Sequence, residues 1–155
     1  MLQGIIVFLI SRSRLLTNCH ILEGRSFVIV VQKETIAQAG IEKANPNTDR
    51  CILKVASRAL NPVSSIRVWN TLQVGEKVYS IGAPRGLEQT LGEGLVSGLR
   101  EYQGIRIVQT TAPISSGSSG GELCDSQGNL VGITTFLLRE TQALNFALLA
   151  KMYWQ

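Results

Sequence analysis

The stretch Leu15-Leu16-Thr17-Asn18-Cys19-His20-Ile21-Leu22 runs from an apolar, strand-like segment into the only histidine of this chain of 155 residues. Far downstream lies one cluster of small residues, Gly117-Ser118-Ser119-Gly120-Gly121. A nucleophilic serine needs a base to accept its proton, and near neutral pH that base is most often an imidazole. Because the chain has one imidazole, any serine–histidine chemistry must use His20.

An aspartate that could hold the far side of this imidazole is found by elimination, since the chain has only two. Asp125 follows Ser119 by six residues and directly precedes a turn-forming segment, which makes it a poor candidate. Asp49 lies where a polar turn enters an apolar, strand-like segment. The predicted order is therefore His20, Asp49, Ser119, with spacings of 29 and 70 residues.

The composition indicates one globular domain, or two small halves that share an interface. Hydrophobic residues make up 45% of the chain and charged residues 17%, enough for a sizeable core and too apolar for a disordered chain. The net charge of +4 comes without a long Lys/Arg run, so no nucleic-acid partner is expected. With one histidine and no C-x-x-C motif, we expect no metal and no cofactor.

The cysteines leave two alternatives open. Cys19 precedes His20, and Cys51 follows Asp49 by two residues. If His20 and Asp49 meet, the two thiols come close enough for a disulfide. Two separate buried thiols fit the sequence equally well.

The chain reads as short strands separated by Gly, Pro, Asn and Ser, and no long stretch has helical periodicity. A short helical turn is expected after His20. This pattern predicts an all-β sandwich or barrel. The expected strands are Ile5–Ile10, Arg14–Thr17, Ser26–Val31, Thr35–Lys43, Cys51–Val55, Lys77–Ile81, Gln89–Leu99, Ile105–Gln109, Leu130–Phe136 and Ala143–Leu148.

The strands divide into two halves. Residues 1–60 carry His20 and Asp49, residues 61–75 form a linker, and residues 76–155 carry Ser119. We therefore expect one domain of two halves with the site in the cleft between them.

The glycine cluster suits acyl transfer, which needs a hydroxyl beside backbone N–H donors that face a developing oxyanion. Glycines expose such amides because they carry no Cβ. A Ser/Gly-rich surface loop is the alternative. The cluster also matches G-x-S-x-G, the nucleophile elbow of α/β-hydrolases. That interpretation fails because no histidine follows Ser119 and the flanks lack a strand-to-helix transition.

Several motifs, in order, resemble the trypsin-like serine proteases of the HtrA (Deg) type, over roughly residues 12 to 149. They are Leu16–Ile21, Asp49 with Ile52–Val55, Gly75–Val78 leading to Ile81–Leu87, Gln89–Thr90 to Gly94–Ser97, and Gln109–Ile114 leading into the glycine cluster and Leu130–Thr135. The resemblance implies the chymotrypsin fold, two antiparallel Greek-key β-barrels with the site between them.

The resemblance also implies roles for the residues. His20 would act as general base and then general acid, and Asp49 would hold the imidazole. Ser119 would attack the peptide carbonyl to give an acyl-enzyme. The N–H groups of Gly117, Ser118 and Ser119 would form the oxyanion hole.

For substrate binding, the resemblance places the base of the side-chain pocket at Pro113, six residues before Ser119, with Ile114 beside it. No carboxylate stands there to pair with Lys or Arg, so small or medium apolar side chains are favoured. Phe146 would narrow the pocket. A strand comprising Thr134, Thr135, Phe136 and Leu137 would pair with the backbone of a peptide or unfolded protein substrate.

The chain also departs from the family. The family normally has one more strand before Gly4, so the first barrel is expected to be incomplete, with an exposed edge. The family's trimer-forming segment is missing as well, so no oligomeric state is predicted. A catalytically silent peptide-binding module on the same fold is therefore the alternative function.

The resemblance favours a periplasmic, secreted or membrane-associated bacterial protein. No signal peptide is visible, because the apolar run Gly4–Ile10 lacks a basic region before it and a cleavage site after it.

Overall fold

The computed structural model describes residues 8–11, 13–56, 60–82, 90–114, 119–139 and 142–154. The strands are β1 (Phe8–Ser11), β2 (Arg14–Thr17), β3 (Phe27–Gln32), β4 (Thr35–Asn45), β5 (Arg50–Val55), β6 (Lys77–Gly82), β7 (Thr90–Tyr102), β8 (Ile105–Thr110), β9 (Glu122–Asp125), β10 (Leu130–Arg139) and β11 (Gln142–Leu149). Short 3₁₀ helices are η1 (His20–Leu22), η2 (Pro46–Thr48), η3 (Trp69–Thr71) and η5 (Ala150–Trp154).

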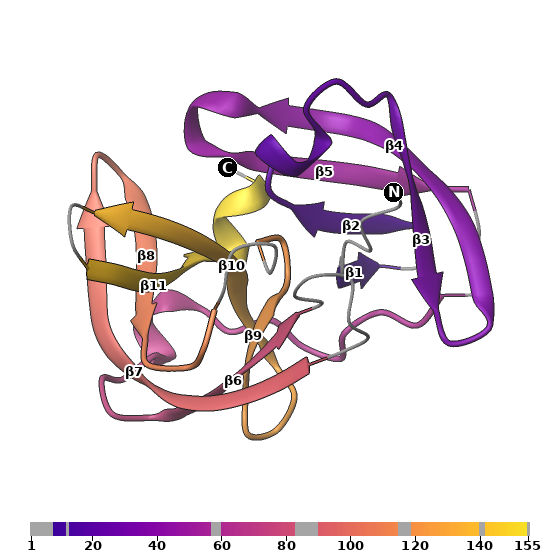
Figure 1. The fold of residues 1–155 in the computed structure, drawn as a ribbon. Coiled ribbons are helices and arrows are strands. Elements are labelled where there is room, and N and C mark those ends of the chain that lie inside the picture. The colour runs from indigo at the N-terminus through magenta and orange to yellow at the C-terminus, as the bar shows by residue number, and fades with distance from the viewer. Residues whose placement is uncertain are drawn as a thin grey trace.

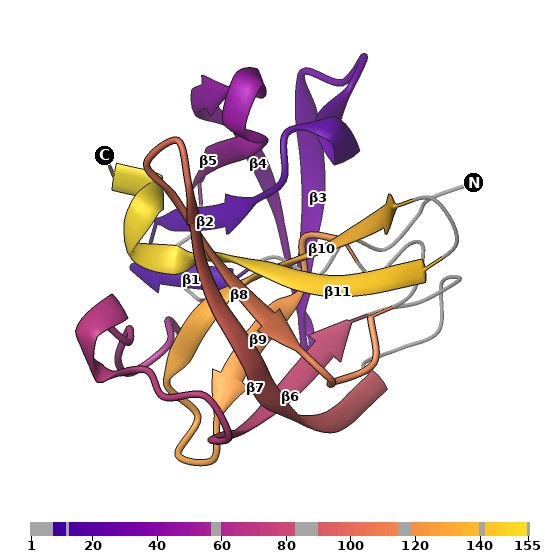
Figure 2. The same ribbon diagram turned by 90° about the vertical axis from the view of Figure 1, so that its left-hand side faces the viewer.

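The strands form two antiparallel layers, one open and one closed (Figures 1 and 2). The first sheet has the order β1-β2-β5-β4-β3, and β1 and β3 are its edges among the described residues. The second layer is a closed barrel with the order β10-β11-β8-β7-β6-β9. This architecture confirms the predicted all-β, two-barrel fold with an incomplete first barrel.

Each of the ten expected strands has an observed counterpart, and four elements among the described residues were missed: β9, η2, η3 and η5. Strand β9 (Glu122–Asp125) escaped notice because it has four residues, begins and ends on a carboxylate and directly follows two glycines. Helix η5 (Ala150–Trp154) is one short turn without a periodic pattern. Residues 5–7 of the expected strand Ile5–Ile10 lie outside the described residues.

Three clusters of buried apolar side chains make up the core. One fills the first sheet around Leu15 and Leu53, and another fills the barrel around Val78 and Val108. The third joins the two layers, and its members come from both. They are Leu16, Ile52, Leu130, Ile133, Leu148, Ala150 and Tyr153. Burying this shared surface fixes the first sheet against the barrel, and so fixes the ends of β2 and β5 relative to β10.

The linker between the layers is held by one arginine. The Arg67 guanidinium donates to the Asp125 carboxylate at 2.9 Å, to Glu76 at 3.2 Å and to the Thr71 hydroxyl at 3.1 Å.

No helix in the described part of the chain is both long and apolar enough to cross a membrane.

Candidate active site

His20 and Asp49 come together at the ends of two paired strands. Helix η1 begins at His20, just after β2, and Asp49 directly precedes β5. Thr17 of β2 lies opposite Cys51 of β5, so the two ends are adjacent. The backbone N–H of His20 donates to Asp49 Oδ1 at 2.9 Å, and His20 Nδ1 lies 2.7 Å from Asp49 Oδ2. The carboxylate thus contacts His20 twice, once at its backbone and once at its imidazole.

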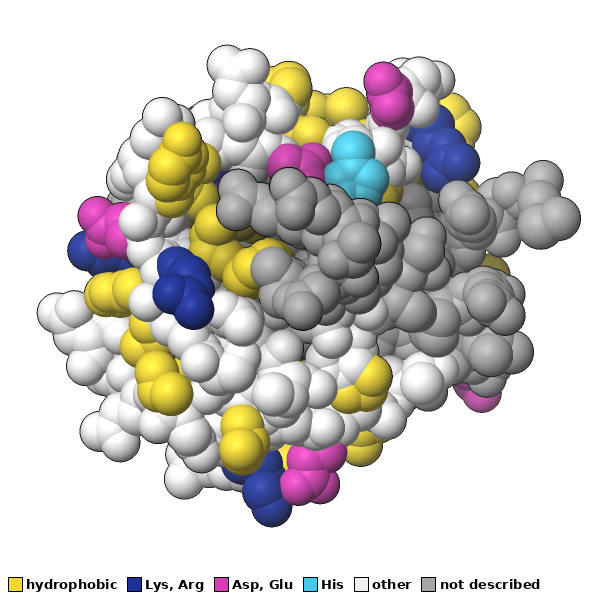
Figure 3. Space-filling model, turned by 60° about the vertical axis from the view of Figure 1, so that its left-hand side comes forward, with side chains coloured by type: hydrophobic (Ala, Val, Ile, Leu, Met, Phe, Trp, Pro, Cys, Tyr) yellow, Lys and Arg dark blue, Asp and Glu magenta, His cyan; other side chains and the backbone are white. Residues whose placement is uncertain are grey.

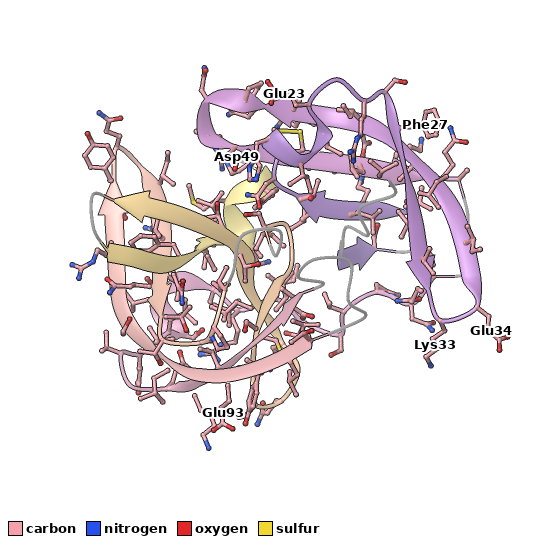
Figure 4. The ribbon with its side chains drawn as sticks, in the orientation of Figure 1. Glu23, Phe27, Lys33, Glu34, Asp49 and Glu93 are labelled. Atoms are coloured by element: carbon pink, nitrogen blue, oxygen red, sulfur yellow. A yellow bond between two sulfur atoms is a disulfide. The ribbon has the colours of Figure 1, made fainter. Side chains whose placement is uncertain are left out.

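The pair lies at the surface rather than in the core. The imidazole is the cyan group in Figure 3, and half of its side-chain surface is exposed. Figure 4 shows Asp49 on the side of the first sheet that faces the barrel. An imidazole that is fixed through Nδ1 and open to solvent presents Nε2 for a proton transfer.

A disulfide joins Cys19 and Cys51, with a Cα–Cα distance of 5.1 Å (Figure 4). The sequence left open whether these cysteines form a disulfide or remain two separate thiols, and the structure has the disulfide. It ties the residue before His20 to the strand that follows Asp49. The third cysteine, Cys124, is free and buried, and burial is the main cause that raises the pKa of its thiol to about 12.

Ser119 lies at the start of the segment that leads into β9, and the two residues after it are fixed to the barrel. Gly120 donates its N–H to the Thr134 carbonyl, and Thr134 donates its N–H to the Gly121 carbonyl, both at 2.9 Å. Gly120 has φ +87°, a conformation in which glycine is favoured. The expected oxyanion-hole residues Gly117 and Ser118 lie outside the described residues.

The segment expected to line the pocket is anchored on both sides. Ser80 donates its hydroxyl to the Pro113 carbonyl at 2.7 Å, and Asn145 donates its amide to the Ala112 carbonyl at 3.1 Å. Pro113 itself is exposed, whereas Ile114 is buried. Sequence reasoning missed Ser80 and Asn145, because nothing local in the sequence relates either of them to residues 112–113.

The expected substrate-pairing strand is part of β10. Thr134 and Thr135 are buried, and Phe136 and Leu137 lie opposite Asn145 and Leu144 of β11. Phe146, opposite Thr135, is half-buried.

The other edge of this part of β10 carries no strand. The β10–β9 ladder ends at Ile133, so within the described ranges no strand pairs with residues 135–139 on that edge.

Asp125 belongs to a different network. Its carboxylate accepts from the Arg67 guanidinium, from the Asn129 amide at 3.0 Å and from the Gln127 N–H at 2.9 Å. Burial alone raises the pKa of Asp125, but these hydrogen bonds outweigh it and lower the pKa below its ordinary value. The elimination of Asp125 as a partner of His20 agrees with this placement.

Glu122 is a buried carboxyl group three residues after Ser119, at the start of β9. Burial raises its pKa from an ordinary value of 4.5 to about 7. The folded protein therefore holds a proton that the unfolded chain releases between these pH values, and stability falls as pH rises through this window. Above pH 7, this effect lowers the free energy of unfolding by about 3 kcal/mol relative to its value below pH 4.5.

Glu122→Gln is expected to remove this penalty, since the amide has a similar shape and does not ionise. Urea unfolding at pH 8 should show the variant more stable than the wild type by up to about 3 kcal/mol. At pH 4.5 the two proteins should differ little, because the carboxyl group is then largely protonated. An equal difference at both pH values would contradict the assignment of this titration to Glu122.

Within the ranges given above, no group of three His, Cys, Asp or Glu side chains is placed to hold a metal ion. The chemistry that the His20–Asp49 pair supports is proton transfer through the imidazole.

The first sheet carries the His–Asp pair and packs on a closed six-stranded barrel that carries the serine-glycine segment. This is the arrangement of trypsin-like proteins, with the first barrel open among the described residues. A sequence model described as "Trypsin-like peptidase domain" matches residues 7–133. The chain belongs to this family, and its relatives are HtrA/Deg proteases.

Named relatives bear this out. Serine endoprotease DegS of Haemophilus influenzae is 33% identical over 148 residues, 86% of this chain and 43% of the relative. Protease Do-like 1, chloroplastic, of Arabidopsis thaliana is 33% identical over 135 residues, 80% of this chain and 30% of the relative. A solved structure of the HtrA-type protease AlgW with a decapeptide superposes with a TM-score of 0.86 at 28% identity, over 96% of this chain and 48% of that one. The chain thus spans less than half the length of these proteins.

Proposed function

We propose that the chain is a serine endopeptidase that uses His20, Asp49 and Ser119. The observation that carries the proposal is the 2.7 Å contact between His20 Nδ1 and Asp49 Oδ2, on an imidazole that is half exposed. This contact keeps the proton on Nδ1 and leaves Nε2 free as a base. The family of the chain and the glycine-rich segment around Ser119 supply the rest of the support.

The reaction proceeds in two halves. His20 Nε2 takes the proton of the Ser119 hydroxyl as the oxygen attacks the peptide carbonyl, and the imidazolium then gives this proton to the leaving amine. Water, activated by the same nitrogen, hydrolyses the acyl-enzyme. Asp49 stabilises the imidazolium in both halves, and the N–H groups of Gly117, Ser118 and Ser119 bind the oxyanion.

The substrate is a peptide or an unfolded protein, bound as an added strand along Thr135, Phe136 and Leu137. Thr134, the first residue of the expected pairing strand, already exchanges backbone hydrogen bonds with Gly120 and Gly121. The edge of β10 beyond Ile133 supports this mode. Pro113 and Ile114 form the base of the side-chain pocket, and Phe146 narrows it. None of these three residues can pair with a cation, so cleavage follows small or medium apolar residues.

Labelling with a fluorophosphonate tests the proposal, since these reagents phosphonylate an activated serine. We expect stoichiometric labelling of the folded protein, and mass spectrometry of the digest should place the adduct on Ser119. Heat-unfolded protein is the matched control and should not react, because an isolated serine is a weak nucleophile. An adduct elsewhere, or none on a protein with an intact circular dichroism spectrum, would refute it.

A catalytically silent peptide-binding module is the second candidate. The first sheet favours it, because among the described residues no strand closes this sheet, and an open sheet holds its side of the site less firmly. Such a module would bind unfolded casein without hydrolysing it and would never react with the fluorophosphonate.

A further inference from the structure

The turn that presents Asp49 needs external support. Asp49 has φ +54°, in the left-handed region that non-glycine residues seldom adopt. Its N–H donates to the Pro46 carbonyl at 3.2 Å. Its own carbonyl accepts from the Asn18 amide at 3.3 Å and from the Cys19 N–H at 3.4 Å. A strained conformation of this kind persists only where its surroundings determine it.

Arg50, the next residue, reaches from this turn to the C-terminus. Its Nε donates to the Thr48 hydroxyl at 2.8 Å, and its Nη1 donates to the Met152 carbonyl. One guanidinium therefore bridges the residue before Asp49 and helix η5, which runs from the barrel to the first sheet (Figure 1). The two contacts use two separate nitrogens of a rigid planar group, whereas a lysine offers all its donors from one nitrogen on a flexible stem.

Helix η5 is a firm anchor for this bridge. Tyr153 is buried in the cluster that joins the two layers, together with Leu16 and Ile52. Burial, and then the negative charge of Asp49, raise the pKa of the Tyr153 phenol, as expected for a ring packed behind the Asp49 turn. The sequence gives one sign of this arrangement, a cation directly after Asp49 at the start of β5.

We propose that Arg50 is a positioning residue that holds the Asp49 carboxylate on the imidazole of His20 by tying the 48–49 turn to η5. Its importance for turnover rests on the peptidase function proposed above. Arg50 itself touches neither substrate nor reacting atoms. Loss of the bridge lets the turn relax, so Asp49 Oδ2 no longer keeps the proton on Nδ1.

The test compares Arg50→Gln with Arg14→Gln. Arg14 is a matched control because it also makes two side-chain hydrogen bonds, both to Glu42 at 2.8 Å, on the exposed part of the same sheet. With an N-acetyl-alanine nitrophenyl ester we expect Arg50→Gln to lower kcat by about 10- to 100-fold at nearly unchanged KM. Arg14→Gln should leave both constants unchanged.

A second readout does not need activity. The chain has one histidine, so the ¹⁵N chemical shifts of labelled histidine report which ring nitrogen of His20 carries the proton. The wild type and Arg14→Gln should show the Nδ1–H tautomer, and Arg50→Gln a mixture. Wild-type kcat together with an unchanged tautomer in folded Arg50→Gln would overturn the proposal.

Two further outcomes are distinguishable. If the wild type neither reacts nor hydrolyses, but Arg50→Gln still shifts the tautomer, the positioning role stands and the proposed function is wrong. If Arg50→Gln does not fold, Arg50→Lys takes its place, with an expected kcat between those of the wild type and an unbridged site. A folded lysine variant with wild-type kcat and tautomer would then count against the bridge.

Discussion

Ser119→Ala and His20→Ala are each expected to lower kcat for the hydrolysis of fluorescently labelled casein by about 10⁶-fold. The alanine at 119 has no oxygen to attack the carbonyl, and without the imidazole the serine hydroxyl keeps its proton at neutral pH. Because the two side chains act as one unit, the double variant should be no slower than either single variant. Measurement of residual hydrolysis at high enzyme concentration gives all three rates.

Asp49→Asn belongs to the same experiment and should be milder, at about 10⁴-fold, since the amide favours the wrong tautomer of His20 without removing the base. Circular dichroism spectra should show all variants folded, because His20 and Asp49 lie at the surface. Independent, additive losses for Ser119→Ala and His20→Ala would mean that the two residues do not cooperate, and the proposed mechanism would fall.

The sequence predicted the fold from strong local signals, whereas it assigned Asp49 to His20 by elimination between two aspartates. Short Val- and Ile-rich strands with turn residues between them are readable one by one. A single histidine leaves no choice of base. The disulfide could not be decided in the same way. Its cysteines are 32 residues apart, and only the pairing of β2 with β5 brings them within bonding distance.

Other features depend on contacts between distant segments and had no local signal. Arg67 and Asp125 lie 58 residues apart, and Arg50 and Met152 lie 102 residues apart. The Arg50–Met152 contact depends on the packing of the barrel and η5 on the first sheet, and the Arg67–Asp125 contact depends on the position of the linker against β9. Sequence periodicity describes which face of a strand is buried, but not which cation a buried carboxylate or carbonyl will meet.

Two glycines of β7 illustrate this dependence on packing. A Cβ on Gly94 would lie 2.1 Å from the Ala112 nitrogen, and one on Gly92 would lie 2.3 Å from Pro113 Cγ. The segment 111–113 therefore rests directly on the β7 backbone. It is also tied there, since the Thr111 N–H donates to the Leu95 carbonyl at 3.0 Å and the Thr111 hydroxyl accepts from the Leu95 N–H at 2.8 Å.

Gly94→Ala is expected to destabilise the protein by about 3 kcal/mol or more, because the methyl group meets backbone atoms that cannot turn away. Gly98→Ala, on the same strand, is the matched control. Its Cβ would lie 3.2 Å from the end of the flexible Gln109 side chain. We expect Gly98→Ala to change the free energy of unfolding by no more than about 1 kcal/mol, because alanine also reduces the conformational freedom of the unfolded chain. Urea unfolding monitored by tryptophan fluorescence measures both free energies.

The same substitution also tests where the substrate pocket lies. A methyl group at position 94 pushes on Ala112, and Ala112 leads directly into Pro113 and Ile114, the expected base of the pocket. Under conditions where Gly94→Ala is still folded, its rate of fluorophosphonate labelling should change little, while KM for substrates with an apolar side chain in the pocket should rise. Gly98→Ala should alter neither. An unchanged KM in folded Gly94→Ala would place the pocket elsewhere than against the 112–114 segment.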